Sequence, residues 1–411
     1  MFTKENFEVR IVKCLYPWDR AEWKVMDYGL EPGLEILFEM ATLLVGDEEV
    51  GIAAIAGGSA SGKTTGVSKK LRDEFAPSSA ILSIDDYLIG KRLMALNSVP
   101  NFDHPKAYDM KLIAQHLANL TQGQPVMKPI YSFKTGERVG QEQFLPCKLI
   151  IPEGLFAIHD DLMEFTRVRV FVQIGTHGRL IRRIVRDVDR TDMTPAQILD
   201  YFASVVQPMH EKWVEKQTKN AHIIIQNEYQ PDIEAERAGL SEVQLKFRVK
   251  FDPETLRRIG GERLGAIRQR DTYFNPFDRD LSRTGESLRI REELGSRSIT
   301  YKGPRKLGSD YRERQKIEFE INAKTMRNFI AIYGKQVKVI EKLRVLYHLD
   351  GLIFSVDKVI SIKNGARTNL GTFVEIRAMK KGTVEPQIAE VLARLGLDPA
   401  NGIQEAYVEM G

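Results

Sequence analysis

Residues 57–65 combine the residue types that bind nucleotide phosphates. They read Gly-Gly-Ser-Ala-Ser-Gly-Lys-Thr-Thr and follow an apolar run at 50–56 that is typical of a buried strand. Glycines let backbone N–H groups converge on phosphate oxygens, and a following helix adds its positive dipole end. The lysine of such a loop reaches the β- and γ-phosphates, and the next hydroxyl binds Mg²⁺. The expected nucleotide-binding residues are Gly57, Gly58, Ser59, Ala60, Ser61, Gly62, Lys63, Thr64 and Thr65, with Thr64 also a metal ligand.

Apolar runs alternate with amphipathic helical stretches between residues 50 and 229. This alternation predicts an α/β domain, in which helices cover both faces of a parallel sheet. The expected strands are 50–56, 80–84, 149–152, 168–174 and 221–226, and the expected helices include 111–120, 179–188 and 195–212.

Beyond a connector at 230–235, the apolar period changes to two. In 242–251, Glu, Gln, Lys, Arg and Lys share one face, and Val, Leu, Phe, Val and Phe share the other. Such alternation predicts antiparallel strands with a charged face. It recurs at 288–291, 298–302, 316–321, 342–344 and 373–377. A one-sided sheet that faces water and a closed barrel with a polar lumen both explain this pattern, and periodicity alone does not separate them.

Length and composition bound the protein class. A chain of 411 residues favours two domains, which we expect at 1–235 and 236–411. Its 60 basic and 56 acidic residues give a net charge of +4, so no global field favours a nucleic-acid partner. The two cysteines lack metal-ligand spacing, and no apolar run approaches the ~20 residues that span a bilayer. We therefore expect a cytoplasmic protein without a membrane partner, whose oligomeric state the sequence does not define.

The first domain resembles the uridine kinase/phosphoribulokinase family over most of 50–229. Besides the loop at 57–65, the resemblance rests on Ser-Ile-Asp-Asp-Tyr at 83–87, Asn-Phe-Asp-His-Pro at 101–105, Pro-Ile-Tyr-Ser-Phe at 129–133, Glu-Gly-Leu at 153–155, an arginine-rich stretch at 179–187 and Gln-Pro-Met-His at 207–210. The family implies phosphoryl transfer from ATP or GTP to an acceptor hydroxyl.

The kinase resemblance also assigns roles to individual residues. It makes Asp85 the base toward the acceptor hydroxyl and Glu153 a carboxylate that holds Mg²⁺ through water. Lys63, Arg182 and Arg186 complete the expected catalytic set. The expected acceptor-binding residues are Asp103, Tyr131, Phe133 and Arg179.

Residues from about 240 to 411 resemble the CYTH, or triphosphate tunnel, superfamily. The matching stretches include Glu-Val-Gln-Leu-Lys at 242–246, Asp-Thr-Tyr-Phe at 271–274, Glu-Ser-Leu-Arg-Ile-Arg at 286–291, Glu-Phe-Glu at 318–320, Lys-Leu-Arg at 342–344 and Leu-Gly-Thr-Phe-Val-Glu at 370–375. This superfamily implies a closed, eight-stranded antiparallel tunnel of the α+β class. The order of the two domains is similar to that of plant tunnel proteins with a uridine-kinase-like domain.

A triphosphate tunnel needs carboxylates for Mg²⁺ or Mn²⁺ and cations for phosphate oxygens. The expected metal ligands are Glu242, Glu318, Glu320 and Glu375. The expected triphosphate-binding residues are Lys246, Arg289, Arg291, Lys302, Lys342 and Arg344.

Four positions depart from the two family patterns. Gly136 stands where uridine kinases normally have a base-contacting His, and 188–193 lacks their usual Glu-Arg-Gly-Arg. These changes argue against uridine or cytidine as the acceptor. In the tunnel, Gln244 and Arg377 replace frequent glutamates, which argues against two-metal catalysis.

Three functions fit these patterns. One is a P-loop phosphotransferase coupled to a tunnel phosphohydrolase that acts on triphosphate, pyrophosphate or a nucleotide. Another is a nucleotide-dependent switch with a polyphosphate-binding tunnel. The third is a class-IV-like adenylate cyclase, although no residue identifies a site that would position a ribose 3′-hydroxyl.

Overall fold

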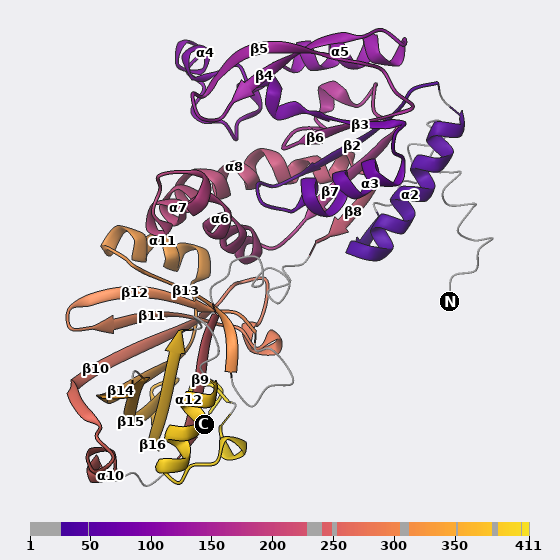
Figure 1. Cartoon of the computed structure of the whole chain (residues 1–411). Helices are drawn as coiled ribbons and strands as arrows, with labels where there is room; N and C mark the ends of the chain where they lie inside the picture. Colours follow the sequence, from indigo (N-terminus) through magenta and orange to yellow (C-terminus); the bar gives the residue numbers. More distant parts are fainter. Residues whose placement is uncertain are drawn as a thin grey trace. The chain divides into compact units, whose positions relative to one another are not determined.

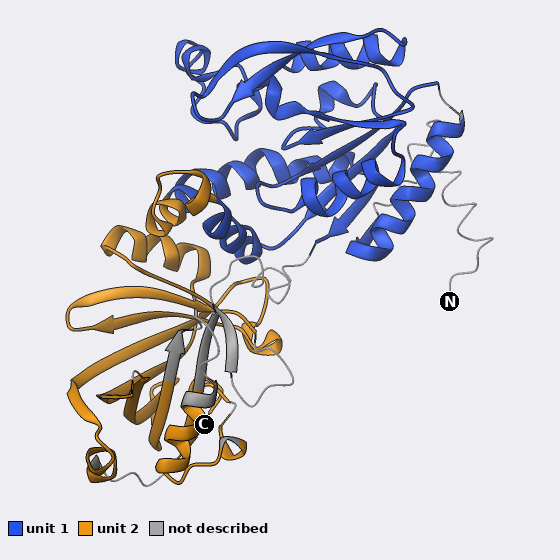
Figure 2. Ribbon diagram, viewed as in Figure 1, with its two compact units in different colours: residues 1–186, 201–229 blue, residues 187–200, 230–411 orange. Residues whose placement is uncertain are grey.

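The computed structural model describes residues 26–47, 49–227, 241–248, 253–304, 312–350, 352–379, 385–403 and 405–410. The chain divides into two compact units, residues 1–186 with 201–229 and residues 187–200 with 230–411 (Figure 2). The expected domain boundary at residue 235 lies outside the described residues. Across the described ranges, no helix is both long and apolar enough to span a bilayer.

A six-stranded parallel sheet forms the centre of the first unit (Figure 1). Its strands follow the order β1-β8-β7-β2-β6-β3, as the α/β prediction requires. They are β1 Met26–Gly29, β2 Gly51–Gly57, β3 Ser79–Ser83, β6 Leu149–Gly154, β7 Val168–Gln173 and β8 Ile223–Gln226. Strands β2 and β6 are buried along their whole length, which is typical of a sheet covered on both faces. The α/β prediction is therefore confirmed, although β1 was not expected.

The side chains of β2 pack into two separate apolar cores, one on each face of the sheet. Ile52 packs in one core with Leu117 of α5, and Ile55 packs in the other with Leu37 of α2. Helices therefore cover both faces of the sheet. The helices of this unit are α2 Leu30–Asp47, α3 Lys69–Glu74, α4 Lys91–Leu96, α5 Met110–Thr121, α8 Gln207–Met209 and most of α6 Thr176–Arg190, whereas nearly all of α7 Pro195–Tyr201 belongs to the second unit.

A separate hairpin, β4 Val126–Ser132 with β5 Glu137–Phe144, was not predicted from the sequence. Gly136 lies in its turn with φ +74°. A Cβ there would lie 2.4 Å from the Cε atom of Lys91. The left-handed backbone disfavours an L side chain at this position, whereas the flexible Lys91 side chain could move away from a Cβ.

The second unit contains a closed eight-stranded antiparallel barrel, which decides between the two alternatives left open by periodicity (Figure 1). The barrel order is β10-β11-β12-β13-β9-β16-β15-β14. Its strands are β9 Ser241–Arg248, β10 Glu262–Asn275, β11 Ser287–Glu293, β12 Ser296–Lys302, β13 Arg312–Glu320, β14 Lys335–Leu349, β15 Leu352–Lys363 and β16 Ala366–Met379. The sequence did not predict β10 or β15.

The apolar face of the barrel strands points outward. Leu245 of β9 and Ile376 of β16 pack against Leu392 of α12, which is Glu385–Arg394. Lys246 and Glu375 alternate with these apolar residues, so their side chains lie on the lumen face. The charged faces predicted from the sequence therefore meet inside the barrel. The unit also contains α10 Pro253–Arg258 and α11 Ala323–Tyr333.

Candidate functional site

The phosphate-binding loop leaves the carboxyl end of β2 and enters a helix at Lys63. Gly62 has φ +80°, and a Cβ there would lie 2.2 Å from Nδ2 of Asn227. The Ser61 carbonyl accepts hydrogen bonds from Asn227 Nδ2 at 2.7 Å and from Arg182 Nη1 at 3.2 Å. The loop is therefore held by Asn227, which directly follows β8, and by Arg182 of α6. The helix that begins at Lys63 starts where the sequence predicts the phosphates to bind.

Lys63, Thr64 and Glu153 come together at the sheet edge, as predicted. The Thr64 hydroxyl donates to Glu153 Oε2 at 3.1 Å, and Lys63 Nζ lies 3.8 Å from Oε1 of the same carboxylate. Burial raises the pKa of Glu153, while Lys63 lowers it. A hydroxyl and a carboxylate side by side are oxygen ligands suited to a hydrated Mg²⁺ beside phosphates.

Asp85 follows β3 at the same carboxyl edge of the sheet. Tyr108 donates its hydroxyl to Asp85 Oδ1 at 3.1 Å, which the sequence did not predict. Burial raises the pKa of Asp85, against the opposing effects of Lys63 and this hydrogen bond. A carboxylate in this arrangement can accept a proton.

Asp103, from the Asn-Phe-Asp-His-Pro stretch, is buried close to Asp85. Burial raises the pKa of Asp103, and the charge of Arg183 lowers it. Arg183 also donates to Ser59 Oγ at 2.8 Å. Arg183 thus links the phosphate loop to the expected acceptor site, and it belongs to the group of helix arginines that the sequence marks as possible phosphate contacts.

Helix α6 presents the other predicted arginines in different ways. Arg182 contacts the loop through Ser61, and the charge of Arg186 lowers the pKa of Asp85. Arg179 is buried, donates to Gln207 Oε1 at 2.5 Å, and lies over the ring of Phe202.

The expected aromatic acceptor residues lie together but differ in exposure. Tyr131 is buried, and its ring is edge-on to Phe133 at 5.3 Å and to Phe102 at 6.3 Å. Phe133 is 74% exposed, so only its edge contributes to this cluster. His210 packs against Gly58, and burial lowers its pKa to about 3, which leaves the imidazole neutral near the loop.

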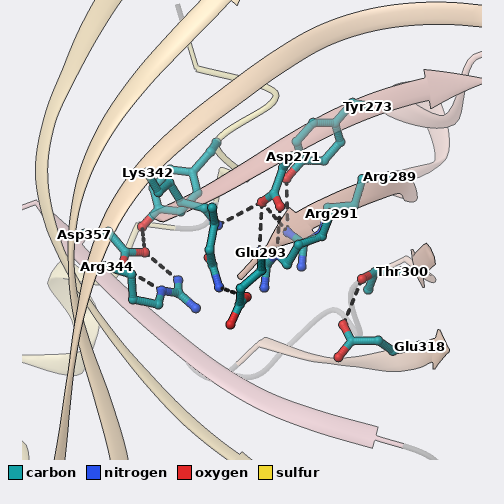
Figure 3. A network of polar contacts seen from close by, with 12 residues as sticks. Asp271, Tyr273, Arg289, Arg291, Glu293, Thr300, Glu318, Lys342, Arg344 and Asp357 are labelled. Atoms are coloured by element: carbon teal, nitrogen blue, oxygen red, sulfur yellow. Dashed lines mark hydrogen bonds and ion pairs between the residues drawn. The ribbon is translucent and has the colours of Figure 1, made fainter. Parts of the chain in front are cut away.

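In the barrel, one buried carboxylate gathers three predicted phosphate-binding residues (Figure 3). Asp271 accepts from Arg291 Nε at 2.7 Å and Arg291 Nη2 at 2.8 Å, and from Arg289 Nη1 at 3.0 Å. Lys342 Nζ lies 2.8 Å from Asp271 Oδ2. Burial alone would raise the pKa of Asp271, but Arg289, Lys342 and Arg291 hold it well below its ordinary value.

A second buried carboxylate, Asp357 of β15, binds Arg344 of β14. Arg344 donates to both Asp357 oxygens, at 2.7 and 2.5 Å, and to Glu375 Oε2 at 2.5 Å. Glu375 was expected to bind a metal, and here its carboxylate accepts from an arginine. Neither Asp271 nor Asp357 was given a role from the sequence.

The other predicted tunnel residues lie on β9, β12 and β13. Glu318 accepts from Thr300 Oγ1 at 2.8 Å and lies 3.6 Å from Lys316 Nζ, and Glu320 pairs in register with Ser298. Lys302 is buried at the end of β12, and Lys246 donates to the carbonyl of Glu405. Glu242 lies in β9, but its side chain is outside the described residues. Within the described ranges, no three His, Cys, Asp or Glu side chains converge as metal ligands.

The predicted charges are nevertheless segregated around the barrel. The expected acidic ligands lie on the consecutive strands β13, β9 and β16. All the expected cations except Lys246 lie on β14, β11 and β12, and β10 with Asp271 lies between β14 and β11. A linear phosphate anion could therefore contact cations along one arc of the wall and face carboxylates on the other.

Lys63→Ala should weaken the binding of Mg·ATP and Mg·GTP roughly 10–100-fold, because a charge-assisted contact contributes about 1.5–3 kcal/mol. Lys70→Ala is the control, since Lys70 lies on the following helix in an exposed pair with Glu31. Calorimetric titration measures both affinities. Equal nucleotide affinity in the two folded variants would contradict the role of Lys63.

Tyr108→Phe should shift the acid limb of the pH–rate profile for phosphoryl transfer to higher pH. The hydrogen bond favours ionised Asp85, so its loss raises the pKa of a base that works unprotonated. Tyr87→Phe is the matched control, because its buried hydroxyl contacts His116 Nδ1 at 2.9 Å instead. An acid limb that stays in place in Tyr108→Phe would show that the hydroxyl does not act on the base.

Asp271→Asn should lower the free energy of unfolding by about 3–5 kcal/mol, because it leaves buried cations without their counter-charge. The depressed pKa of Asp271 means that its stabilisation is present above the ordinary carboxyl pKa and is lost as pH falls. Glu341→Gln, in a more exposed pair with Arg270 and Arg367, should cost under ~1 kcal/mol. Urea titration followed by circular dichroism compares them, and equal losses would refute the distinction.

Two family models match this chain, and several known proteins are similar to parts of it. Residues 52–234 match the Phosphoribulokinase / Uridine kinase family, and residues 240–407 match the CYTH domain. Inorganic pyrophosphatase TTM1 of Arabidopsis thaliana is 26% identical over 87% of this chain and 53% of its own length. A uridine kinase of Macrococcus caseolyticus is 35% identical over 42% of this chain and 86% of its own length. A conserved hypothetical protein from Pyrococcus furiosus, at 27% identity and a TM-score of 0.34, covers 41% of this chain and 99% of its own.

The chain spans about half the length of the plant pyrophosphatases that it matches. Its kinase-like segment covers nearly all of a bacterial uridine kinase at more than 30% identity. The CYTH match begins shortly after that segment ends. The chain belongs to the phosphoribulokinase/uridine kinase family and carries a CYTH domain after its P-loop domain.

Proposed function

We propose that this chain has two phosphate-processing sites. The first unit transfers a phosphoryl group from Mg·ATP or Mg·GTP to an acceptor hydroxyl. The second hydrolyses a short linear phosphate anion, pyrophosphate or triphosphate, inside the barrel. The observation that carries the barrel activity is the convergence of Arg289, Arg291 and Lys342 on one buried aspartate.

The first site has the parts that phosphoryl transfer requires. Lys63 contacts the β- and γ-phosphates, and Arg182 and Arg186 neutralise charge on the transferred group. Asp85 takes the proton of the acceptor hydroxyl, while Asp103 and the Tyr131 cluster bind the rest of the acceptor. Thr64 and Glu153 fit Mg²⁺ as a hydroxyl and a nearby carboxylate, and the ion would supply further neutralisation of the phosphates.

The second site supports hydrolysis of a compact anion. Fixed cations in a confined lumen are worth more than the same groups in water, because they need no reorganisation when negative charge develops. Arginine forks match phosphate oxygens in pairs, and Asp271 holds two such forks in place. The similarity to a plant inorganic pyrophosphatase over most of this chain supports pyrophosphate as the substrate class.

We also propose that the barrel needs Mg²⁺ or Mn²⁺, held on the acidic arc by Glu318, Glu320 and Glu242. Carboxylates are the ligands that such ions prefer. The described carboxylates do not by themselves form a metal cage, and Glu375 already accepts from Arg344. We therefore assign no step to the metal, and we take the cationic arc as the part of the site that binds the phosphates.

The test is a product-identified assay with pyrophosphate, tripolyphosphate, ATP, GTP and a nucleoside panel. Arg289→Ala/Arg291→Ala should lower pyrophosphate and tripolyphosphate hydrolysis by roughly 10²–10³-fold or more, the effect of losing preorganised charge, and keep nucleotide binding. Lys63→Ala should weaken nucleotide binding and keep the hydrolysis of pyrophosphate and tripolyphosphate. Arg297→Ala is the control, since this β12 arginine pairs with Glu292 at the surface. Unchanged hydrolysis in folded Arg289→Ala/Arg291→Ala would refute the barrel site.

A further inference from the structure

The C-terminal segment, residues 405–410, lies against the lumen wall of the barrel. Tyr407 and Met410 are each 5% exposed and pack in one apolar cluster with Phe373 of β16 and Ile340 of β14. Both partners alternate with outward-facing residues, so they belong to the lumen face. The segment therefore fills part of the same space that the proposed phosphate site uses.

One of the expected phosphate-binding cations is covered by this segment. Lys246 Nζ donates to the carbonyl of Glu405 and lies 4.3 Å from the ring centroid of Tyr407. The backbone N–H of Ile403 donates to the carbonyl of Lys246 at 2.6 Å, which fixes the start of the segment on β9. A carbonyl and an aromatic face thus supply to Lys246 the partial negative charge that a phosphate oxygen would otherwise provide.

The ring of Tyr407 is held in position at its other end. Its hydroxyl donates to Asp357 Oδ2 at 3.2 Å, and its ring is edge-on to Phe373 at 5.0 Å. Lys342 Nζ lies 5.5 Å from the ring centroid. The ring is therefore a neighbour of both Lys246 on β9 and Lys342 on β14, two lysines that a longer anion would have to bridge.

The last described residue closes the segment onto a further lysine. Lys338 Nζ donates to the carbonyl of Met410 at 2.9 Å. Lys338 lies four residues before Lys342 in β14, and the two side chains point to the same face because faces alternate along a strand. Three lumen lysines thus contact the segment or its ring, whereas Arg289 and Arg291 contact Asp271.

We propose that Tyr407 sets the length of the phosphate chain that the barrel accepts. This inference rests on the proposed hydrolytic function and names its substrate class more narrowly. A two-phosphorus anion fits against Arg289, Arg291 and Lys342 with the segment in place. A longer chain needs Lys246 as well, and it reaches that ammonium only by displacing the ring and the Glu405 carbonyl. The barrel therefore prefers pyrophosphate to tripolyphosphate.

The experiment measures dissociation constants for pyrophosphate and tripolyphosphate on the full chain, with Mg²⁺ present, and compares their ratio between variants. Tyr407→Ala should increase tripolyphosphate affinity at least tenfold relative to pyrophosphate. Tyr407→Phe keeps the ring and should leave the ratio near that of the wild type. Val408→Ala is the control within the same segment. If Tyr407→Ala does not fold, Tyr407→Leu keeps apolar volume while removing the aromatic face.

Two results would overturn the proposal in different ways. An unchanged ratio in a folded Tyr407→Ala or Tyr407→Leu protein that still binds pyrophosphate would refute the role of Tyr407 alone. Failure of every variant, and of the wild type, to bind either anion would refute the hydrolytic function as well. Adding Arg289→Ala/Arg291→Ala to each variant should abolish the binding, which identifies the lumen as its location.

Discussion

Asp271 has no exposed surface, and three cationic side chains lie within 3.0 Å of its oxygens. Its negative charge faces two guanidinium groups and Lys342, and burial together with the charge of Arg291 lowers the pKa of Lys342 well below its ordinary value. Burying ions away from water raises the free energy of the folded state, and this is offset only where the ions have good geometry and hydrogen bonds. Asp271 satisfies that condition by accepting on both oxygens. We propose that the two guanidinium groups held by Asp271 bind the anion, so that one interaction both orders the barrel wall and presents charge to a ligand.

In the P-loop unit, the expected phosphate donors are mainly backbone N–H groups, whereas in the barrel they are buried charged side chains. Its loop presents N–H groups at a helix start, and the Ser61 carbonyl is held by Asn227 and Arg182. Its carboxylates Asp85 and Glu153 lie beside Lys63, and burial raises the pKa of each. We propose that this edge of the sheet binds a nucleotide and that the barrel binds a smaller phosphate anion among its side chains.

The sequence predicted the parts whose chemistry is local. The loop at 57–65 needs its residues in one short stretch, and the charged faces of β9, β11 and β13 follow from period-two alternation. Strand β10 was missed because Arg268 and Arg270 flank Gln269 and Asp271, so neither face reads as apolar. Asp271 gains its role from residues that follow it by 18 to 71 positions, and the contact of Tyr407 with Asp357 spans 50 residues. Long-range pairing of this kind leaves no local pattern.

The central claim is that the cationic arc of the barrel binds a linear phosphate anion. A crystal structure of the full chain with Mg²⁺ and imidodiphosphate, a non-hydrolysable analogue of pyrophosphate, tests it most directly. We expect anion density against Arg289, Arg291 and Lys342, with any metal on the side of β13, β9 and β16. Density confined to the P-loop or to the outer surface, with the lumen contacts of Asp271 unchanged, would contradict it.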